Sequence, residues 1–523
     1  MDRRQFMLNT LVGLGAAPLY AARNLPSYPF TLGIASGDVT ASSTVLWTRL
    51  APAPMAIDGG MPNAGMQVQW LLSQTPDMAQ IVQRGETLTQ SAWAHSVHVE
   101  VDNLEAGREY WYQFRAGNHV SPIGRTKTLA AGNNALSSAR FVTASCQNYT
   151  HGYFVAYRHM VADQPDFVIH LGDYIYDTSF GETFRQHDMQ AAPATLDDFR
   201  RRHALYKTDR DLQHAHAQIP FFLSIDNHDA LEDNDPAKAQ MRAAAYQAWY
   251  EHMPVRGYQK PGDNHFDIHR RIAVGNLARI SMLDSRQFRD KREICTGEYD
   301  PDYGFGNYRT RCPAVFEEDR SMLGDAQERW LTSSLIENES TWNVLASPGP
   351  FLPFSYRHKG EDLRYIGAWD AYPANRARVM DAFARSGSGH PLVLSGDVHS
   401  FWALDGARAT SADERFPLVE FVTSAISANW PPPLAQPVTD NLPNNPQVTF
   451  YDPVYRGYLL HEVNSRTWTT HARGIEDMRD PHSAVRTLAR FTVRHGQAGF
   501  QQDTGLSSGV FTAAWVRGCR ADV

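Results

Sequence analysis

Two stretches of the sequence run from apolar residues straight into Gly-Asp, and each then places a second metal-binding type of side chain close behind. The stretch FVIHLGDYIYD offers Asp173 and, three positions on, Tyr176. The stretch PLVLSGDVHSF offers Asp397 and, two positions on, His399. A carboxylate can bridge two ions, and phenolate and imidazole groups are ligands of iron. One such pair alone is more often turn chemistry than a metal site.

Two further polar segments follow apolar runs in the same part of the chain. The segment ASCQN offers the thiolate of Cys146, and IDNHD offers the amide oxygen of Asn227 beside His228. A lone cysteine in such a place is most often an inert small hydrophobe, but the four segments together are hard to obtain from turn chemistry. They predict a dinuclear metal site, with hard ligands, imidazole and phenolate favouring Fe(III) at one position. The carboxylate and amide set without sulfur favours Ca(II), Mg(II) or Mn(II) at the other.

Strands must bring these side chains together. From Phe141 onward, short apolar runs such as ARFVTAS, DFVIHLG, IPFFLSI, TWNVLAS and HPLVLSG alternate with helix-like segments. This alternation predicts a layered α/β domain, which we place at residues 138–510. In such folds ligands gather in the loops at the carboxyl ends of strands, where the polar segments lie.

The region before this domain has a different sequence pattern. Residues 27–130 hold short alternating runs such as STVLWTRL and YWYQFRAG, separated by turn residues, without a long helical pattern. This pattern predicts a small all-β sandwich of the fibronectin III-like type. The polar stretch AAGNNALSSAR at 130–140 then predicts a linker.

The first residues, 1–23, predict a signal peptide, with a cationic start, an apolar run and small residues at its end. The pair Arg3 and Arg4 before Gln5 and Phe6 resembles a twin-arginine signal, whose partner is the export machinery for folded proteins. The alternatives are a plain Sec signal or a membrane anchor, but the run falls short of the ~20 apolar residues of a spanning helix. We therefore expect a periplasmic or extracellular protein without a transmembrane anchor after processing.

Composition excludes one class of function and points to a compartment. The 523 residues carry 49 basic and 57 acidic side chains, so the chain shows no basic footprint for sequence-specific nucleic-acid binding. Four cysteines occur, of which Cys295 and Cys312 bracket a polar loop. In an oxidising compartment we expect a disulfide there, worth roughly 3 kcal/mol, over the alternative of two free thiols. Cys519 has no evident partner.

These motifs resemble a known family. GDYIY, DNHD and GDVH resemble the metallophosphoesterase pattern in the Gly-Asp-x-x-Tyr form shared with purple acid phosphatases. The stretch ASCQNYTHGYFVAYRHMVADQPDFVIHLGDYIYD closely resembles the PhoD-type alkaline phosphatases and phosphodiesterases. FTLGIASGDVTASSTVLWTRL is similar to the β domain that precedes their catalytic domain, and LDSRQFRD is another family-like stretch. The resemblance covers nearly the whole chain.

The resemblance implies a ligand set. Fe(III) would be held by Cys146, Asp173, Tyr176 and His399, with Asp173 bridging to a second metal, calcium in this family, that also meets Asn227 and Asp397. His228 would stand near the phosphate as the catalytic residue.

The chain departs from the family pattern in two places. Asn227 replaces the second acid of the usual Asp-Asp-His-Glu, and Ser347 and Pro348 stand where relatives carry glutamines. A third ion near Glu232 or Asn234 is left without a placement.

The implied activity is hydrolysis of phosphate monoesters or diesters by a hydroxide that two cations generate from water, with His228 protonating the leaving oxygen or steadying charge. A phospholipase D-like diesterase and a non-catalytic exported protein that binds a surface polymer stay open as alternatives. A serine hydrolase is disfavoured, because no Gly-x-Ser-x-Gly turn is evident beside these strands. We expect specificity to reside in pocket walls built by Thr178–Gln218 and Arg286–Arg320.

Overall fold

The computed structural model describes most of the chain. The described residues are 25–132, 138–230, 236–262, 266–295, 307–387, 391–411, 414–430 and 432–503. The predicted signal peptide, part of the predicted linker, the residues named for a third ion and Cys519 lie outside them. Within the described part, no helix combines the length and the apolar character needed to cross a membrane.

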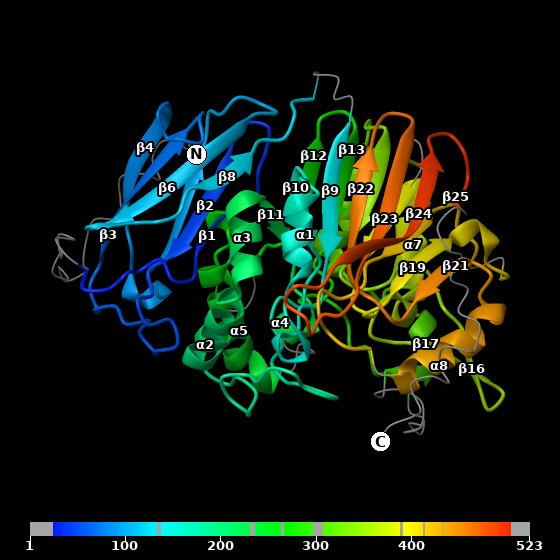
Figure 1. The fold of residues 1–523 in the computed structure, drawn as a ribbon. Helices are drawn as coiled ribbons and strands as arrows, with labels where there is room; N and C mark the ends of the chain where they lie inside the picture. The colour runs from blue at the N-terminus through cyan, green and yellow to red at the C-terminus, as the bar shows by residue number, and fades with distance from the viewer. Residues whose placement is uncertain are drawn as a thin grey trace, which may run out of the picture.

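Two large β-sheets form the centre of the molecule (Figure 1). The first has the strand order β25 (Gln501–Gln502), β24 (Val485–Arg494), β23 (Thr467–Ile475), β22 (Arg456–Val463), β9 (Ala139–Ala144), β10 (Phe167–His170), β11 (Phe221–Leu223), β1 (Ile34–Gly37), β2 (Thr44–Arg49) and β5 (Ser96–Val101). The second has the order β12 (Arg270–Val274), β13 (Ala278–Met282), β15 (Trp342–Ala346), β18 (Pro391–Ser395), β20 (Val419–Val422), β19 (Phe401–Asp405) and β21 (Val448–Asp452). Strands β9, β10 and β11 run parallel to one another, as do β13, β15, β18 and β20.

Alternating residues of these strands belong to different cores, which is why the runs are apolar throughout. Phe141, Phe167 and Ile169 of the first sheet join Val344 and Leu392 of the second in one buried cluster between the sheets. Their strand neighbours point the other way and pack against helices, because successive strand side chains face opposite sides of a sheet.

Helices cover both outer faces and complete a layered α/β domain. Buried residues of α1 (Ala156–Ala162), α2 (Leu196–Lys207), α3 (Arg210–Gln218) and α5 (Ala239–His252) pack on the first sheet. Buried residues of α6 (Gly324–Ile336), α7 (Pro373–Ala384) and α8 (Pro432–Asn441) pack on the second. Thr195 fixes the start of α2 through a capping box with Asp198, and the Asp209 side chain caps α3. These two helices lie within the segment predicted to build a pocket wall.

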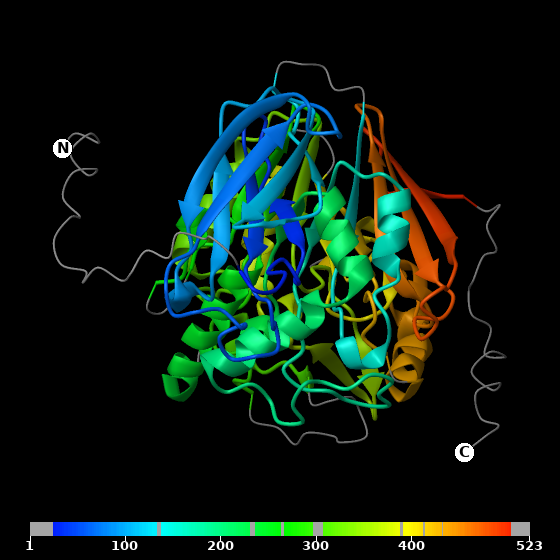
Figure 2. The same cartoon turned by 60° about the vertical axis from the view of Figure 1, so that its left-hand side comes forward.

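The N-terminal region forms the predicted β-sandwich-like unit, seen at the left of Figure 1 and brought forward in Figure 2. Its outer sheet has the order β4 (Ile81–Leu88), β3 (Gln67–Ser73), β6 (Glu109–Ala116) and β7 (His119–Val120), with β8 (Gly124–Lys127) also pairing with β6. This sheet shares a buried core with β1, β2 and β5. Those strands also continue the first large sheet, because Gly37 pairs with Phe221 of β11. A β-carbon at Gly37 would lie 2.3 Å from the carbonyl oxygen of Pro254, so this junction requires glycine.

A small third sheet and a disulfide belong to the second half of the domain. The sheet has the order β14 (Tyr308–Thr310), β17 (Glu361–Tyr365) and β16 (Tyr356–His358). Cys295 and Cys312 form a disulfide with their Cα atoms 5.6 Å apart, which confirms the predicted bridge.

A buried lysine lies where the N-terminal unit meets the helices of the α/β domain. Lys207 at the end of α2 is 2% exposed, and its Nζ lies 4.4 Å from the ring centroid of Trp47 on β2. Burial lowers the pKa of Lys207 to about 7. The junction therefore stabilises the neutral form of this lysine.

We expect Lys207→Met to raise the thermal unfolding midpoint, and to do so more near pH 7 than near pH 10. The unfolded chain keeps the lysine protonated up to its ordinary pKa of 10.5, whereas the folded chain releases the proton near 7. The penalty on folding is therefore complete below about pH 7 and disappears as the pH rises toward 10.5, and its size is on the order of a few kcal/mol. Lys238→Met, at an exposed position, is the matched control. An equal effect of Lys207→Met at both pH values would contradict this account.

Candidate metal centre

Several of the predicted ligands sit in strained backbone just past the ends of strands. Cys146 follows β9, Asp173 follows β10, and Asp397 and His399 follow β18. Their φ angles are 57°, 53°, 71° and 48°, in the left-handed region that non-glycine residues avoid. Each such residue costs on the order of 1–3 kcal/mol, and a concentration of them in one place is typical of functional sites. The surrounding sheets hold the backbone of these four residues in this conformation.

The glycines before the two aspartates are required by the close approach of neighbouring strand ends. A β-carbon at Gly172, whose φ is 113°, would lie 2.5 Å from the Asp226 Cβ. A β-carbon at Gly396 would lie 2.7 Å from the Ser145 Oγ. Both distances are too short for a β-carbon and a non-bonded atom, so only glycine lets the strand ends converge. This explains why a buried strand runs twice into Gly-Asp.

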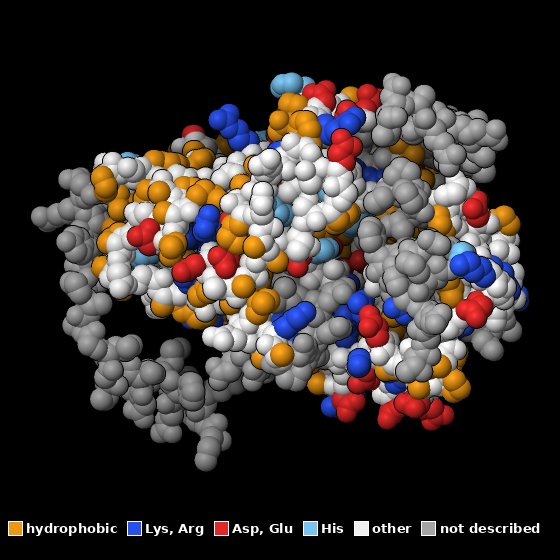
Figure 3. Space-filling model, turned by 90° about the horizontal axis from the view of Figure 1, so that it is seen from below, with side chains coloured by type: hydrophobic (Ala, Val, Ile, Leu, Met, Phe, Trp, Pro, Cys, Tyr) orange, Lys and Arg blue, Asp and Glu red, His pale blue; other side chains and the backbone are white. Residues whose placement is uncertain are grey.

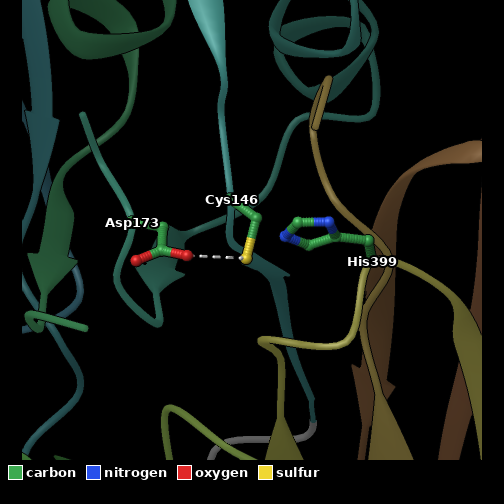
Figure 4. A group of neighbouring side chains, drawn as sticks. All are labelled: Cys146, Asp173 and His399. Carbon is green, nitrogen blue, oxygen red and sulfur yellow. Dashed lines mark hydrogen bonds between the residues drawn. The ribbon is translucent and has the colours of Figure 1, made fainter. Parts of the chain in front are cut away.

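Two groups of potential ligand atoms result, and they share one carboxylate. Cys146, Asp173 and His399 have ligand atoms within 4.8 Å of one another, and so do Asp173, Asp226 and Asp397. Figure 4 shows the first group, in which the three side chains point toward one another from different segments. The thiol of Cys146 lies 3.6 Å from Asp173 Oδ2. Asp173 is thus placed to bridge two ions.

Tyr176 joins the first group. Its Oη lies 3.2 Å from Asp173 Oδ2 and 2.9 Å from His399 Nε2. The other ring nitrogen of His399 donates to the carbonyl oxygen of Asn429 at 2.8 Å, which leaves Nε2 as the ligand atom. Burial lowers the pKa of His399 to about 3, so its imidazole is neutral and able to bind a metal. The four residues that the resemblance assigns to iron therefore meet at one point.

The second group contains a carboxylate that the sequence analysis did not assign. Asp226 follows β11, is 1% exposed, and forms an ion pair with Arg286. Asn227 starts the short helix α4 (Asn227–Ala230), and its Oδ1 accepts a hydrogen bond from Arg286 Nη2 at 3.3 Å. Asp226 precedes Asn227 in IDNHD, so its position after an apolar run was the available signal. The assignment of Asn227 as a ligand stays a prediction.

The last acid of IDNHD has a structural role. Asp229 Oδ1 accepts hydrogen bonds from the backbone N–H groups of Tyr174 at 2.9 Å and Ile175 at 3.1 Å. Its Oδ2 accepts one from the backbone N–H of Asp226 at 3.1 Å. This carboxylate therefore ties the turn after β10 to the turn after β11.

His228 lies beside the shared carboxylate. Its backbone N–H donates to Asp173 Oδ1 at 3.1 Å, and its ring stacks on Tyr176 with centroids 4.1 Å apart. Its Nδ1 lies 2.6 Å from Asp177 Oδ1. Burial alone would raise the pKa of Asp177, but the hydrogen bond and charge of His228 hold that pKa below its ordinary value.

One side chain of the site is partly exposed. The His228 side chain is 21% exposed, whereas Asp173 is 1% exposed. Figure 3 views the molecule from the end at which α4 lies in Figure 1, and histidine side chains reach the surface near the middle of that face. His228 is therefore more accessible to solvent than the shared carboxylate.

The electrostatics of the site favour a bound cation. Burial and the nearby Asp226 raise the pKa of Asp397 to about 7, and burial is the main cause that raises the pKa of Asp173 to about 6. Burial also raises the pKa values of the Cys146 thiol and the Tyr176 phenol. Such a set is destabilised when ionised unless positive charge enters it. The residues fit metal ions, with thiolate, phenolate and imidazole groups suiting iron and the all-oxygen group suiting a hard divalent ion.

We expect bound metal to stabilise the protein more near pH 8 than near pH 5. In the metal-free protein, a carboxyl whose pKa is raised by folding destabilises the folded state as the pH rises above its ordinary pKa of 3.8. The loss is complete above the folded pKa, which is about 6 for Asp173 and about 7 for Asp397. Metal removes this loss by neutralising the ionised groups. The measurement is the difference in thermal midpoint between loaded and chelator-treated protein at both pH values. Asp211→Asn, which alters a half-buried carboxylate paired with Arg158, should leave that difference unchanged. A difference independent of pH would contradict the expectation.

Comparisons with known proteins identify the family. The family model of the PhoD-like phosphatase matches residues 141–472, and the model of the PhoD-like phosphatase N-terminal domain matches residues 15–130. Alkaline phosphatase D of Bacillus subtilis (strain 168) is 36% identical over 97% of this chain and 91% of its own length.

Solved structures give the same result. A structure of PhoD superposes with a TM-score of 0.83 at 35% identity, covering 92% of this chain and 93% of the other. A purple acid phosphatase from yellow lupin, PPD1, has a TM-score of 0.54 at 12% identity over 90% of this chain and 75% of its own, which shows a shared fold alone. The resemblance drawn from the motifs is thereby confirmed, and the non-catalytic alternative is set aside. The chain belongs to the PhoD-like phosphatase family and is a phosphoric ester hydrolase.

Proposed function

We propose that this chain is an exported, metal-dependent phosphatase or phosphodiesterase that uses a water-derived hydroxide to attack phosphorus. The observation that supports this most is the position of Asp173, whose carboxylate belongs to both groups of ligand atoms. Sharing one carboxylate is how two ions are held at the short separation that phosphoryl transfer uses.

The proposed ions follow from the donor atoms. Fe(III) would bind Cys146, Asp173, Tyr176 and His399, and a divalent ion, calcium by family resemblance, would bind Asp173, Asn227 and Asp397, to which we add Asp226. When bound, the pair of cations would lower the pKa of water toward neutrality and offset negative charge on the phosphoryl group.

His228 is the residue we assign to the leaving group. Because the Asp177 carboxylate accepts a hydrogen bond from Nδ1, the opposite nitrogen, Nε2, is the atom that exchanges a proton. The stacking of the ring on Tyr176 fixes its plane beside the shared Asp173. The His228 ring is thus fixed in orientation next to the proposed ligand Asn227, which is the arrangement that a general acid requires.

Export is supported by two independent features of the chain. The pair Arg3 and Arg4 resembles a twin-arginine signal, and a folded precursor is compatible with metal insertion before export. The disulfide between Cys295 and Cys312 is of the kind that persists outside the reducing cytoplasm. We therefore propose a periplasmic or extracellular location reached through the twin-arginine machinery.

The roles of two adjacent residues can be separated. We expect Asn227→Ala to lose divalent metal and activity together, because the ion is left short of an oxygen ligand. His228→Ala should keep its metals and lose about two to four orders of magnitude in turnover on alkyl phosphates, but less on nitrophenyl esters, whose leaving group scarcely needs a proton. Metal analysis and rates on the two ester classes provide the measurement.

Two outcomes would contradict the acid role. If His228→Ala emptied the site, His228 would be a ligand. If the variant slowed both ester classes equally with its metals in place, the residue would stabilise charge at phosphorus.

The export route has its own test. Replacing Arg3 and Arg4 together with lysine should leave the protein in the cytoplasm, because the twin-arginine pathway reads the two guanidiniums. A Sec signal keeps its positive charge in this variant and continues to work. Fractionation of cells that express the variant, with the disulfide variant Cys295→Ser as an exported control, gives the answer. Unchanged secretion would remove the twin-arginine assignment.

A further inference from the structure

A tyrosine from the small third sheet reaches the second group of ligands. The phenol Oη of Tyr365, the last residue of β17, lies 2.8 Å from Asp397 Oδ2. The residue belongs to neither large sheet, and no motif in the sequence marked it. It is therefore an addition that the third sheet makes to the metal centre.

The position of this phenol is fixed by its surroundings. A β-carbon at Gly367 would lie 2.5 Å from the phenol carbon and oxygen of Tyr365, so the backbone presses directly against the end of the ring. The ring of Tyr308 packs nearby, with centroids 5.6 Å apart. The hydroxyl has little freedom to leave Asp397, because both the ring and its neighbours are packed.

The hydrogen bond limits what Asp397 can offer a metal. An ionised carboxylate only accepts hydrogen bonds, so the phenol O–H is the donor and Oδ2 the acceptor. The bond occupies one lone pair of Oδ2 and holds that oxygen at the phenol, so Oδ1 is the better placed oxygen to bind an ion. Asp226 is limited in the same way, because its Oδ1 accepts from Arg286 Nε. In each of these two carboxylates, the hydrogen bond makes one oxygen the weaker ligand and so favours binding through the other.

This restriction matters because divalent ions differ in the ligands they accept. Calcium takes six to eight oxygens and commonly binds carboxylates through both oxygens, whereas magnesium takes about six in a tighter octahedron and keeps several waters. One-oxygen carboxylates leave positions of the ion open for water and for a phosphate oxygen. They also remove part of the advantage that calcium gains from a bidentate carboxylate.

We propose that Tyr365 is a positioning residue for the second metal, which holds Asp397 to one oxygen and so shifts the ion preference of the site from calcium toward magnesium. The proposal rests on the proposed function, because it requires a divalent ion beside Asp397. It is carried by the hydrogen bond between Tyr365 and Asp397 and by the packing against Gly367. The same restriction keeps open the positions at which substrate would enter.

Tyr365→Phe tests the proposal, because it removes only the hydroxyl. Iron-containing protein is first freed of divalent ions with a chelator, and the dissociation constants for calcium and for magnesium are then measured by titration calorimetry. We expect the variant to favour calcium over magnesium about tenfold more than the unaltered protein does, since Asp397 becomes free to bind through both oxygens. Tyr308→Phe is the matched control, because it removes the hydroxyl of a neighbouring tyrosine of the same sheet, which donates to Tyr356 Oη at 3.1 Å. The control should leave the preference unchanged.

The other outcomes overturn the proposal. If Tyr365→Phe weakened both ions by the same factor, the residue would only support the fold. If neither constant moved, the hydroxyl would play no part. An unaltered protein that binds no divalent ion at all would instead refute the proposed function, so the two failures are distinguishable. Thermal midpoints of both variants establish that they are folded.

Discussion

The burial of Asp173 between two groups of ligands is the constraint on which the rest of the structure depends. Three carboxylates have oxygens within 4.8 Å of one another, and two of them, those of Asp173 and Asp226, are buried, whereas that of Asp397 is half-buried. Their repulsion would open the site unless cations enter it and the backbone holds them. In the proposed site, bound ions would supply the positive charge, and the protein supplies the rigidity.

The rigidity comes from the way two sheets meet. Parallel strands of each sheet end at the same edge, and Ser145 of the first sheet bridges to Ala425 beside the second. Glycines at 172 and 396 let the ends approach, and Asp229 joins two of the turns by three backbone hydrogen bonds. Left-handed backbone at the proposed ligands persists only because the packed surroundings leave these residues no other conformation. The packed sheets therefore hold these residues in their strained backbone conformation.

The motifs predicted the α/β class, the preceding β unit and a convergence of strand ends, because apolar periodicity and Gly-Asp turns are local features. They did not reveal Asp226, Arg286 or Tyr365 as members of the site. Arg286 and Tyr365 come from segments about 60 and 140 residues after Asp226, and only the packing of the second sheet against the first brings them near. The sequence motifs also could not predict that β1 continues the large sheet, because this depends on one long-range pairing.

Analysis of the metals in purified, active protein tests the central claim most directly. The account predicts iron in the protein, with a visible charge-transfer band from the phenolate of Tyr176 or the thiolate of Cys146, because both side chains lie against the shared Asp173. Replacing Tyr176 with phenylalanine should move that band while the fold is kept. Active protein that contains no iron would contradict the assignment of this group of residues to Fe(III).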